Sequence, residues 1–353
     1  MFRRSRRIGP LHHTCGSIDR CFALPYNRNM KVFLTGGTGF IGSHLVDSLL
    51  AENDTEIFAL VRDLSNKKWL EGRDIHCLEG DLESLPSLPE DVDIIFHLAG
   101  STKARKPADY YTVNQGGSAS LFQTLADRGL RPRRLVLLSS LAAAGPSRSG
   151  RPVRESDPPQ PLTPYGHSKL AGELEAQKFK DRFPLTIIRV GPVFGPRDKD
   201  FITLFRMVRK GIMPTFGSAG HQVSLCYVKD LVKALKMSML DDSPSGEIFN
   251  IGDPKPYSWD EFGRAAGTVL GKSPRMIRFP LPVVYLVAII SEAVCKITRQ
   301  TSILDRNKIR EMRQDAWVAD IGKAQERLGF SSDYTLEEAL RETLNWYLNH
   351  HLL

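Results

Sequence analysis

The sequence predicts an α/β protein with a doubly wound parallel sheet followed by a smaller lobe. Three observations predict this fold: short apolar strands alternate with helical segments over residues 31–190, a glycine-rich turn follows the first strand, and the pattern loosens beyond residue 191. Near-continuous apolar strands are typical of parallel sheets that helices cover on both faces. We therefore expect residues 30–190 to form a nucleotide-binding domain. Residues 191–353 are expected to form a substrate-binding lobe, partly interwoven with that domain.

The expected elements follow from the apolar pattern of each stretch. Short apolar runs predict strands at residues 31–35, 56–61, 74–79, 93–98, 134–138 and 185–190. Longer stretches with a helical period predict helices at residues 43–51, 109–128 and 165–182. Beyond residue 191 we expect a strand at 247–251 in the lobe, whereas the helical period of 227–240 allows that segment to return to the sheet.

The charge is concentrated at the amino-terminal end of the chain. Of 353 residues, 41% are hydrophobic and 25% charged, which is typical of globular proteins. Residues 1–29 contain six arginines and one aspartate, so they supply +5 of the net charge of +8. The small remainder argues against a nucleic-acid partner. We expect residues 1–29 to be a disordered basic extension or an upstream translation start, with organelle targeting as the alternative.

The five cysteines indicate a reducing compartment. They are odd in number, scattered, and form no C-x-x-C pair, which argues against a disulfide framework or a metal site. A cytoplasmic location follows as the expectation. No stretch reaches the roughly 18–20 apolar residues that span a bilayer, and residues 281–291 come nearest. A buried helix is favoured there, with contact to a membrane surface or lipid substrate through residues 281–297 as the alternative.

A glycine turn follows the first strand and opens the first helix. Glycines let the backbone approach a pyrophosphate, and the free N–H groups and dipole of the helix start attract its charge. This arrangement predicts a Rossmann fold that binds a dinucleotide, although glycine turns also occur for structural reasons alone. The residues expected to contact the cofactor here are Thr35, Gly36, Gly39, Phe40, Ile41 and Gly42.

The residue after the second strand selects between the two nicotinamide cofactors. An acid there bonds the ribose of NAD, whereas a cation accommodates the 2′-phosphate of NADP. Arg62 stands at this position, and Asp63 follows it. Because a guanidinium suits a phosphate, NADP(H) is favoured and NAD(H) stays open. Further cofactor contacts are expected after the third and fourth strands, at Asp81, Leu82, Leu98, Ala99 and Gly100.

Three residues predict the chemistry. Tyr165 and Lys169 are four apart on an expected helix and therefore share a face. A nearby ammonium favours the phenolate, so we expect Lys169 to lower the pKa of Tyr165. The phenol would then exchange a proton with a substrate hydroxyl while hydride passes to or from the nicotinamide. Ser140, just past the fifth strand, would hydrogen-bond the substrate oxygen.

With these motifs the chain resembles the extended short-chain dehydrogenase/reductases, also called the NAD-dependent epimerase/dehydratase family. The family's T-G-x-x-G-x-x-G corresponds to residues 35–42, and its Y-x-x-x-K to residues 165–169. Its V-N-x-x-G corresponds to residues 113–117, which implies that Asn114 supports the proton relay. Its R-P-x-x-V-Y-G-P corresponds to residues 189–196, which implies that Pro192 and Val193 approach the nicotinamide carboxamide.

Departures from the family's motifs indicate the branch. Dehydratases of the family carry Asp-Glu after the catalytic serine or threonine, whereas Leu141 and two alanines follow Ser140 here. Many nucleotide-sugar epimerases place an arginine before the Y-V-x-D strand, and residues 221–227 contain none. Residues 61–68 resemble the NADPH loop of dihydroflavonol-reductase-like enzymes. Residues 281–297 and 317–330 resemble the 3β-hydroxysteroid/sterol dehydrogenase group.

The resemblance implies an NAD(P)-dependent oxidoreductase of the hydroxyl or ketone of a bulky, largely apolar small molecule, sterol-, isoprenoid- or dihydroflavonol-like. An NAD-dependent sugar or nucleotide-sugar epimerase is the alternative. A dinucleotide-binding module without turnover is the second alternative, against which the intact Ser140, Tyr165 and Lys169 speak. The resemblance also implies a homodimer through the helices expected at 109–128 and 165–182.

Overall fold

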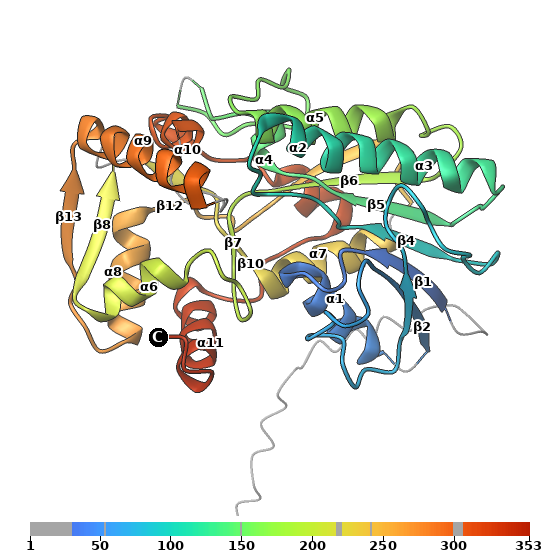
Figure 1. Ribbon diagram of the computed structural model, residues 1–353, viewed down its shortest axis with the longest axis horizontal. Coiled ribbons are helices and arrows are strands. Elements are labelled where there is room, and N and C mark those ends of the chain that lie inside the picture. The colour runs from blue at the N-terminus through green and yellow to red at the C-terminus, as the bar shows by residue number, and fades with distance from the viewer. Residues whose placement is uncertain (1–29, 53, 149, 217–220, 241, 299–305) are drawn as a thin grey trace, which may run out of the picture.

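A seven-stranded parallel sheet organises the chain, which confirms the predicted fold class (Figure 1). The computed structural model describes residues 30–52, 54–148, 150–216, 221–240, 242–298 and 306–353, so the extension expected at residues 1–29 lies outside the described residues. Across the sheet the strands are β11 (Glu247–Ile251), β6 (Leu185–Val190), β5 (Arg134–Leu138), β4 (Ile94–His97), β1 (Met30–Thr35), β2 (Thr55–Val61) and β3 (His76–Glu79).

The strand order places a switch point at the centre of the sheet. The chain moves outward from β1 through β2 to β3, then returns to β4 on the other side of β1 and continues outward. Each neighbouring pair is parallel, with Leu34 opposite Ala59 and Phe96 in the two registers of β1. The carboxyl ends of parallel strands meet at one edge, and the crevice at the switch point is where such sheets bind ligands.

Helices cover both faces of the sheet (Figure 1). Alternate residues of β1 point to opposite faces: Val32 and Leu34 join the core shared with α1 (Phe40–Leu50) and α7 (Val228–Met239), whereas Phe33 joins the core shared with α3 (Gly117–Asp127) and α5 (Pro164–Gln177). This burial on both sides explains why the strands read as continuous apolar runs.

The helix expected at residues 109–128 is interrupted. It consists of α2 (Pro107–Tyr111), a π-helical turn η1 (Thr112–Gly116) and α3. The wider turn lies against α5, where a Cβ at Gly172 would lie 2.4 Å from the carbonyl oxygen of Asn114. Packing against the neighbouring helix therefore accompanies a local geometry that helical periodicity does not reveal.

Strand β11 corrects one expectation. Residues 247–251 were expected to be a strand of the smaller lobe, but they pair with β6 and extend the main sheet. Ile248 lies opposite Ile187, while Phe249 and Ile251 are buried in the core shared with α7. Helix α7 packs against α1 as well as β5 and β6, so this segment does return to the sheet.

Most of the remaining elements form a lobe beside the carboxyl edge of the sheet (Figure 1). Its core is aromatic, with Phe194, Phe205, Phe262 and Tyr347 all buried. Among the helices of the described residues, none is both long and apolar enough to cross a membrane. Two further elements belong to the sheet domain: α4 (Leu141–Ala144) packs against α5, and η2 (Ala324–Leu328) packs against α7 and β11. The other elements are β7 (Val193–Phe194), α6 (Ile202–Arg209), β8 (Ile212–Phe216), β9 (Gln222–Val223), β10 (Cys226–Tyr227), β12 (Tyr257–Ser258), α8 (Trp259–Val269), β13 (Arg275–Phe279), α9 (Leu281–Thr298), α10 (Arg306–Met312), β14 (Ala316–Trp317) and α11 (Leu336–Asn349).

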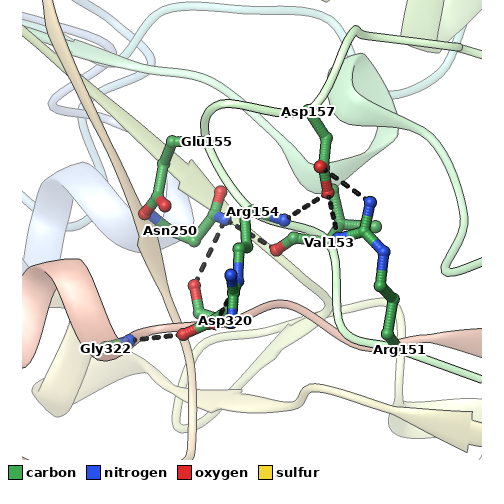
Figure 2. A network of polar contacts seen from close by, with 8 residues as sticks. All are labelled: Arg151, Val153, Arg154, Glu155, Asp157, Asn250, Asp320 and Gly322. Atoms are coloured by element: carbon green, nitrogen blue, oxygen red, sulfur yellow. Dashed lines mark hydrogen bonds and ion pairs between the residues drawn. The ribbon is translucent and has the colours of Figure 1, made fainter.

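A polar network fixes the long connection between α4 and α5 (Figure 2). The Nδ2 group of Asn250, at the end of β11, donates to the carbonyl oxygens of Val153 at 3.1 Å and Asp320 at 3.3 Å. The guanidinium of Arg154 donates to a carboxylate oxygen of Asp320 at 2.9 Å. The connection that separates Ser140 from Tyr165 is thus held by the sheet on one side and by a late segment of the chain on the other.

Candidate active site

The carboxyl edge of the sheet brings the predicted residues together. Thr35 ends β1, Arg62 follows β2, Asp81 follows β3, Leu98 follows β4, and Ser140 lies two residues beyond β5. Pro192 and Val193 follow β6, where Val193 pairs with Cys226. The strands that carry these residues are far apart in sequence. Their parallel pairing places the residues together at one edge of the sheet.

The glycine turn is closed so tightly that two of its glycines are required. Gly36 has φ of +79°, and a Cβ there would lie 2.7 Å from the amide nitrogen of Ala99. A Cβ at Gly42 would lie 2.2 Å from the carbonyl oxygen of Gly36. Helix α1 begins at Phe40, with Gly39 as its N-cap and no side-chain cap. Its first N–H groups are therefore available to an anion, and these residues fit the pyrophosphate of a dinucleotide.

Arg62, in the loop after β2, lies close enough to Asp81, in the loop after β3, for its charge to help lower the pKa of that carboxyl group. Asp63 folds onto its own turn, where its Oδ1 accepts from the amide of Ser65 at 2.9 Å and the hydroxyl of Ser65 at 2.6 Å. Asp81 likewise accepts from the amide of Ser84 at 2.7 Å. These hydrogen bonds lower the pKa of both carboxyl groups. Arg62 is exposed beside them.

Ser140, Tyr165 and Lys169 lie together, as the sequence predicts. Ser140 caps α4, where its Oγ accepts from the amide of Ala142 at 3.1 Å. The same side chain is hydrogen-bonded to the phenol of Tyr165 in the first turn of α5. Lys169, one turn later, donates from Nζ to the carbonyl oxygen of Leu138 at 2.7 Å. A phenol, a hydroxyl and an ammonium thus converge where β5 ends.

The pKa of Tyr165 moves opposite to our expectation. Burial removes water from the phenol and raises its pKa to about 12, although the hydrogen bond from Ser140 opposes this rise. Burial also lowers the pKa of Lys169 to about 8, against the opposing charge of Glu173. Lys169 directs its ammonium to Leu138, so in the protein alone it does not dominate the titration of the phenol.

Asn114 connects α5, the helix that carries Tyr165, with the loop after β4. Its Nδ2 donates to the hydroxyl of Ser168 at 2.9 Å and to the carbonyl of Ser101 at 3.0 Å, and its Oδ1 accepts from the amide of Ser101 at 2.8 Å. A Cβ at Gly100 would lie 3.1 Å from this Oδ1 and 3.6 Å from Nζ of Lys169. Gly100 therefore lies close to both the side-chain oxygen of Asn114 and the ammonium group of Lys169.

A buried chain of hydrogen bonds runs from the glycine turn to Asn114. The hydroxyl of Ser118 donates to the carbonyl of Asn114 at 2.8 Å, so it accepts from Nε2 of His97 at 3.0 Å. Nδ1 of His97 then accepts from the hydroxyl of Thr35 at 2.8 Å. Burial and the charge of Lys169 lower the pKa of His97 to about 3. The imidazole is therefore neutral and locked in one tautomer.

His97 should make the fold sensitive to acid. The unfolded chain binds a proton at this histidine below its ordinary pKa of 6.5, whereas the folded chain does so only below about 3. Stability contributed by the neutral imidazole is present above pH 6.5 and lost as the pH falls, by about 2 kcal/mol at pH 5. We expect His97→Gln to remove this loss. Urea unfolding of both proteins at pH 7.5 and pH 5 measures it, and an unchanged difference in the variant would contradict the assignment.

A buried ion pair between Glu173 and Arg189 joins α5 to β6. Glu173, one turn beyond Lys169, accepts from Nε of Arg189 at 2.9 Å and from its terminal nitrogen at 2.6 Å. The two side chains are 3% and 2% exposed. The hydroxyl of Ser139, beside Ser140, donates to the same carboxylate. The pair therefore links β6, α5 and the residue next to the candidate catalytic serine.

Sequence reasoning missed two neighbours of Tyr165. The ring of Tyr110 in α2 lies 5.8 Å from the ring of Tyr165, centroid to centroid. Glu311 in α10 accepts from the hydroxyl of Thr163 at 3.3 Å, and the charge of this carboxylate raises the pKa of Tyr165. Tyr110 could have been found from its place near the V-N-x-x-G motif, whereas nothing in the local sequence relates Glu311 to Tyr165.

The described residues contain no group of three or more histidine, cysteine, aspartate or glutamate side chains placed to hold a metal ion. Cys77 and Cys226 carry free thiols. Cys226 is buried beside Asp230 and Asp253, and its burial raises the pKa of the thiol.

Comparison with known sequences matches one protein family and several related enzymes. The NAD dependent epimerase/dehydratase family matches residues 32–252. Ceramide reductase of Caulobacter vibrioides is 29% identical over 322 residues, which cover 90% of this chain and 94% of that protein. UDP-glucose 4-epimerase of Vibrio cholerae is 28% identical over 332 residues, which cover 90% and 95%.

Solved structures with this fold include enzymes with NAD or a sugar nucleotide bound. UDP-glucuronic acid 4-epimerase from Bacillus cereus in complex with NAD superposes with a TM-score of 0.73 at 21% identity, covering 91% of this chain and all of that chain. UDP-glucose 4-epimerase from Thermotoga maritima, with UDP-glucose, also gives 0.73 at 24% identity, covering the same shares. At these identities the likeness shows the fold.

Proposed function

The chain belongs to the NAD dependent epimerase/dehydratase family, and from this premise we propose that it is an NADP(H)-preferring oxidoreductase acting on the hydroxyl or ketone of a bulky, largely apolar small molecule. The observation that carries the reaction type is the convergence of Ser140, Tyr165 and Lys169 at the carboxyl edge of the sheet. The nicotinamide supplies the hydride chemistry when it is bound.

Each residue has a distinct proposed task. Tyr165 transfers the proton at the substrate oxygen, and Ser140 hydrogen-bonds that oxygen as charge develops on it. Lys169 supplies positive charge from one turn away, and Asn114 holds the loop after β4 in place. The contacts of Thr35, Gly36, Gly39 and Gly42 support a role in holding the cofactor. Phe40, Ile41, Asp81, Leu82, Leu98, Ala99, Pro192 and Val193 are proposed as further cofactor contacts.

Residues 221–227, together with the pairing of Arg189 and Arg197, favour an apolar substrate over a nucleotide sugar. Residues 221–227 offer no cation, and six of the seven are buried. Arg189 is paired with Glu173, and Arg197 is paired with Asp47. A diphosphate left without a guanidinium would be poorly held. The alternative, an epimerase of a sugar or nucleotide sugar, is supported by the relatives that carry that name.

Cofactor behaviour separates the two reactions. A reductase consumes NADPH steadily in the presence of a suitable ketone, so we expect a substrate-dependent loss of NADPH absorbance with a panel of long-chain and polycyclic ketones. An epimerase regenerates its cofactor, so denaturing the purified protein would release stoichiometric NAD. The same preparation would then interconvert UDP-glucose and UDP-galactose without added cofactor. That second outcome would overturn the proposed reaction, and failure of both assays would favour a module without turnover.

Arg62 is expected to set the cofactor preference. Removing its guanidinium in Arg62→Ala should weaken NADPH binding roughly tenfold or more and leave NADH nearly unchanged, because only NADPH carries the 2′-phosphate. Fluorescence titration of both cofactors against both proteins measures this. Lys67→Ala, in the same loop, is the matched control for loss of one positive charge. Equal weakening of NADH and NADPH by Arg62→Ala would contradict the NADP assignment.

Two properties complete the proposal. Family resemblance supports a homodimer through the surface of α2, α3 and α5, and the scattered cysteines support a cytoplasmic location. Exposed apolar residues of α9 support contact with a membrane surface, for which the charges around that helix give a separate argument.

A further inference from the structure

Helix α9 exposes an apolar face to solvent. Its exposed large apolar side chains are 43–58% accessible, and they are Val283, Tyr285, Leu286, Val287, Ile289 and Ile290. Among its described side chains, at residues 281–291, the buried ones are Val284 and Ala288, which pack against Phe279 and Ile309. A helix packed on one side normally carries polar residues on the other. Contiguous exposed apolar patches of this kind mark interaction sites.

The sequence around α9 is strongly basic. Residues 272–313 contain nine lysines and arginines and three acids, a net charge of +6, whereas residues 30–353 together carry only +3. The rest of that region is therefore net −3, and the positive charge is concentrated in the segments that flank α9 in the sequence. The exposed cations on the flanking β13 and α10 are Arg275, Arg278, Arg306, Lys308 and Arg310.

We propose that α9, with the cations of β13 and α10, docks on the surface of an anionic lipid bilayer. An apolar helix face flanked by lysines and arginines lies in the interface plane, with apolar side chains among the acyl chains and cations at the anionic headgroups. The helix does not cross the bilayer, because none of the described helices is apolar enough to do so. Glu292 and Lys296 interrupt its apolar run.

A second copy of this chain fits the same face less well. A symmetric dimer through α9 would bring two segments of charge +6 together, and like charges at an interface oppose association. A bilayer that contains anionic lipids offers the complementary charge. This docking does not depend on the proposed reaction.

Docking would also bring the membrane close to the candidate active site. Helix α10 packs on α9 through Ile309, and two residues later Glu311 contacts Thr163, the N-cap of the helix that carries Tyr165. An apolar substrate that leaves the bilayer at α9 therefore has a short path to the phenol. If the proposed function holds, this position names its substrate class as membrane-resident lipids that carry a hydroxyl or ketone.

Vesicle co-sedimentation of the full chain tests the docking. We expect binding to phosphatidylcholine vesicles that contain phosphatidylglycerol, several-fold weaker binding to phosphatidylcholine alone, and loss of binding at high salt. Leu286→Asp/Ile290→Asp should weaken binding to the mixed vesicles at least tenfold. Leu240→Asp/Leu348→Asp adds the same two charges at exposed apolar positions outside α9, and it should bind within twofold of wild type.

Reversing the charge of the flanking cations tests the docking independently of the apolar face. Arg275→Glu/Arg310→Glu should weaken binding to the mixed vesicles at least tenfold, whereas Arg131→Glu/Lys180→Glu, on exposed positions of the sheet domain, should not. Thermal melting and NADPH titration confirm that each variant is folded. Unchanged binding in the α9 variant would place the contact elsewhere, the basic residues 1–29 included, and would overturn the proposal. So would a dimer that light scattering shows to dissociate in that variant, because a second copy would then cover the face.

Discussion

Tyr165→Phe is expected to lower kcat by a factor of about 10²–10⁴, the usual contribution of a positioned general acid or base. The substitution removes only the phenol oxygen, which is hydrogen-bonded to Ser140. Since Ser140 keeps its bond from the amide of Ala142, the fold and the affinity for NADPH should change little. Steady-state rates with a ketone that the wild type reduces, together with a cofactor titration, measure both quantities.

Tyr110→Phe is the matched control for this prediction. It removes the same atom from a ring 5.8 Å away, and it should cost less than about tenfold in kcat if Tyr165 alone transfers the proton. Activity retained in Tyr165→Phe would remove the phenol from the mechanism and favour a module without turnover. A large loss in both variants would indicate that the two phenols act together.

Arg189→Met is expected to destabilise the protein by about 3–5 kcal/mol, which is the range for breaking a buried ion pair from one side. The variant leaves the Glu173 carboxylate 3% exposed and without its guanidinium. Because Glu173 lies one turn beyond Lys169 and accepts from Ser139, kcat should also fall while the helix loses its support. Urea unfolding monitored by circular dichroism measures the free energy of unfolding.

The double variant Arg189→Met/Glu173→Leu is the informative comparison. Replacing both charges by apolar side chains of similar size removes the unpaired carboxylate, so most of the lost stability should return. If the double variant is no more stable than Arg189→Met, the loss arises from packing around β6 and the ion pair contributes little.

Strands with a short apolar run, and the glycine turn, could be predicted from the local sequence. Strands β5, β6 and β11 have the bounds expected from their apolar runs. Residues 36–39 form the turn between β1 and α1, but α1 begins at Phe40, before the expected start at Ser43. The order of strands was predictable only in outline. Strand β11 pairs with β6 from 61 residues away, and apolar periodicity alone does not distinguish a strand of the sheet from a strand of the lobe.

The candidate site was predictable where its residues follow a motif. Ser140, Tyr165 and Lys169 meet as expected because the fifth strand and the following helix are neighbours in the fold. The pKa of Tyr165 was not predictable, because burial depends on side chains that arrive from distant segments. Glu311 approaches from a helix 146 residues later in the chain. The neutral His97 lies inside an apolar strand, where spacing says nothing of its partners.

The network around Asn250 affects when the candidate site can form during synthesis of the chain. Residues 30–190 leave the ribosome before residues 191–353 and contain every residue of the proposed proton transfer. The connection between Ser140 and Tyr165, however, is held through Val153 and Arg154 by the later residues Asn250 and Asp320 (Figure 2). The sheet can begin to form on the nascent chain. The connection before Tyr165 gains all of these contacts only after Asp320 has emerged, so we expect chains that end earlier to fold in part and to lack the proposed activity.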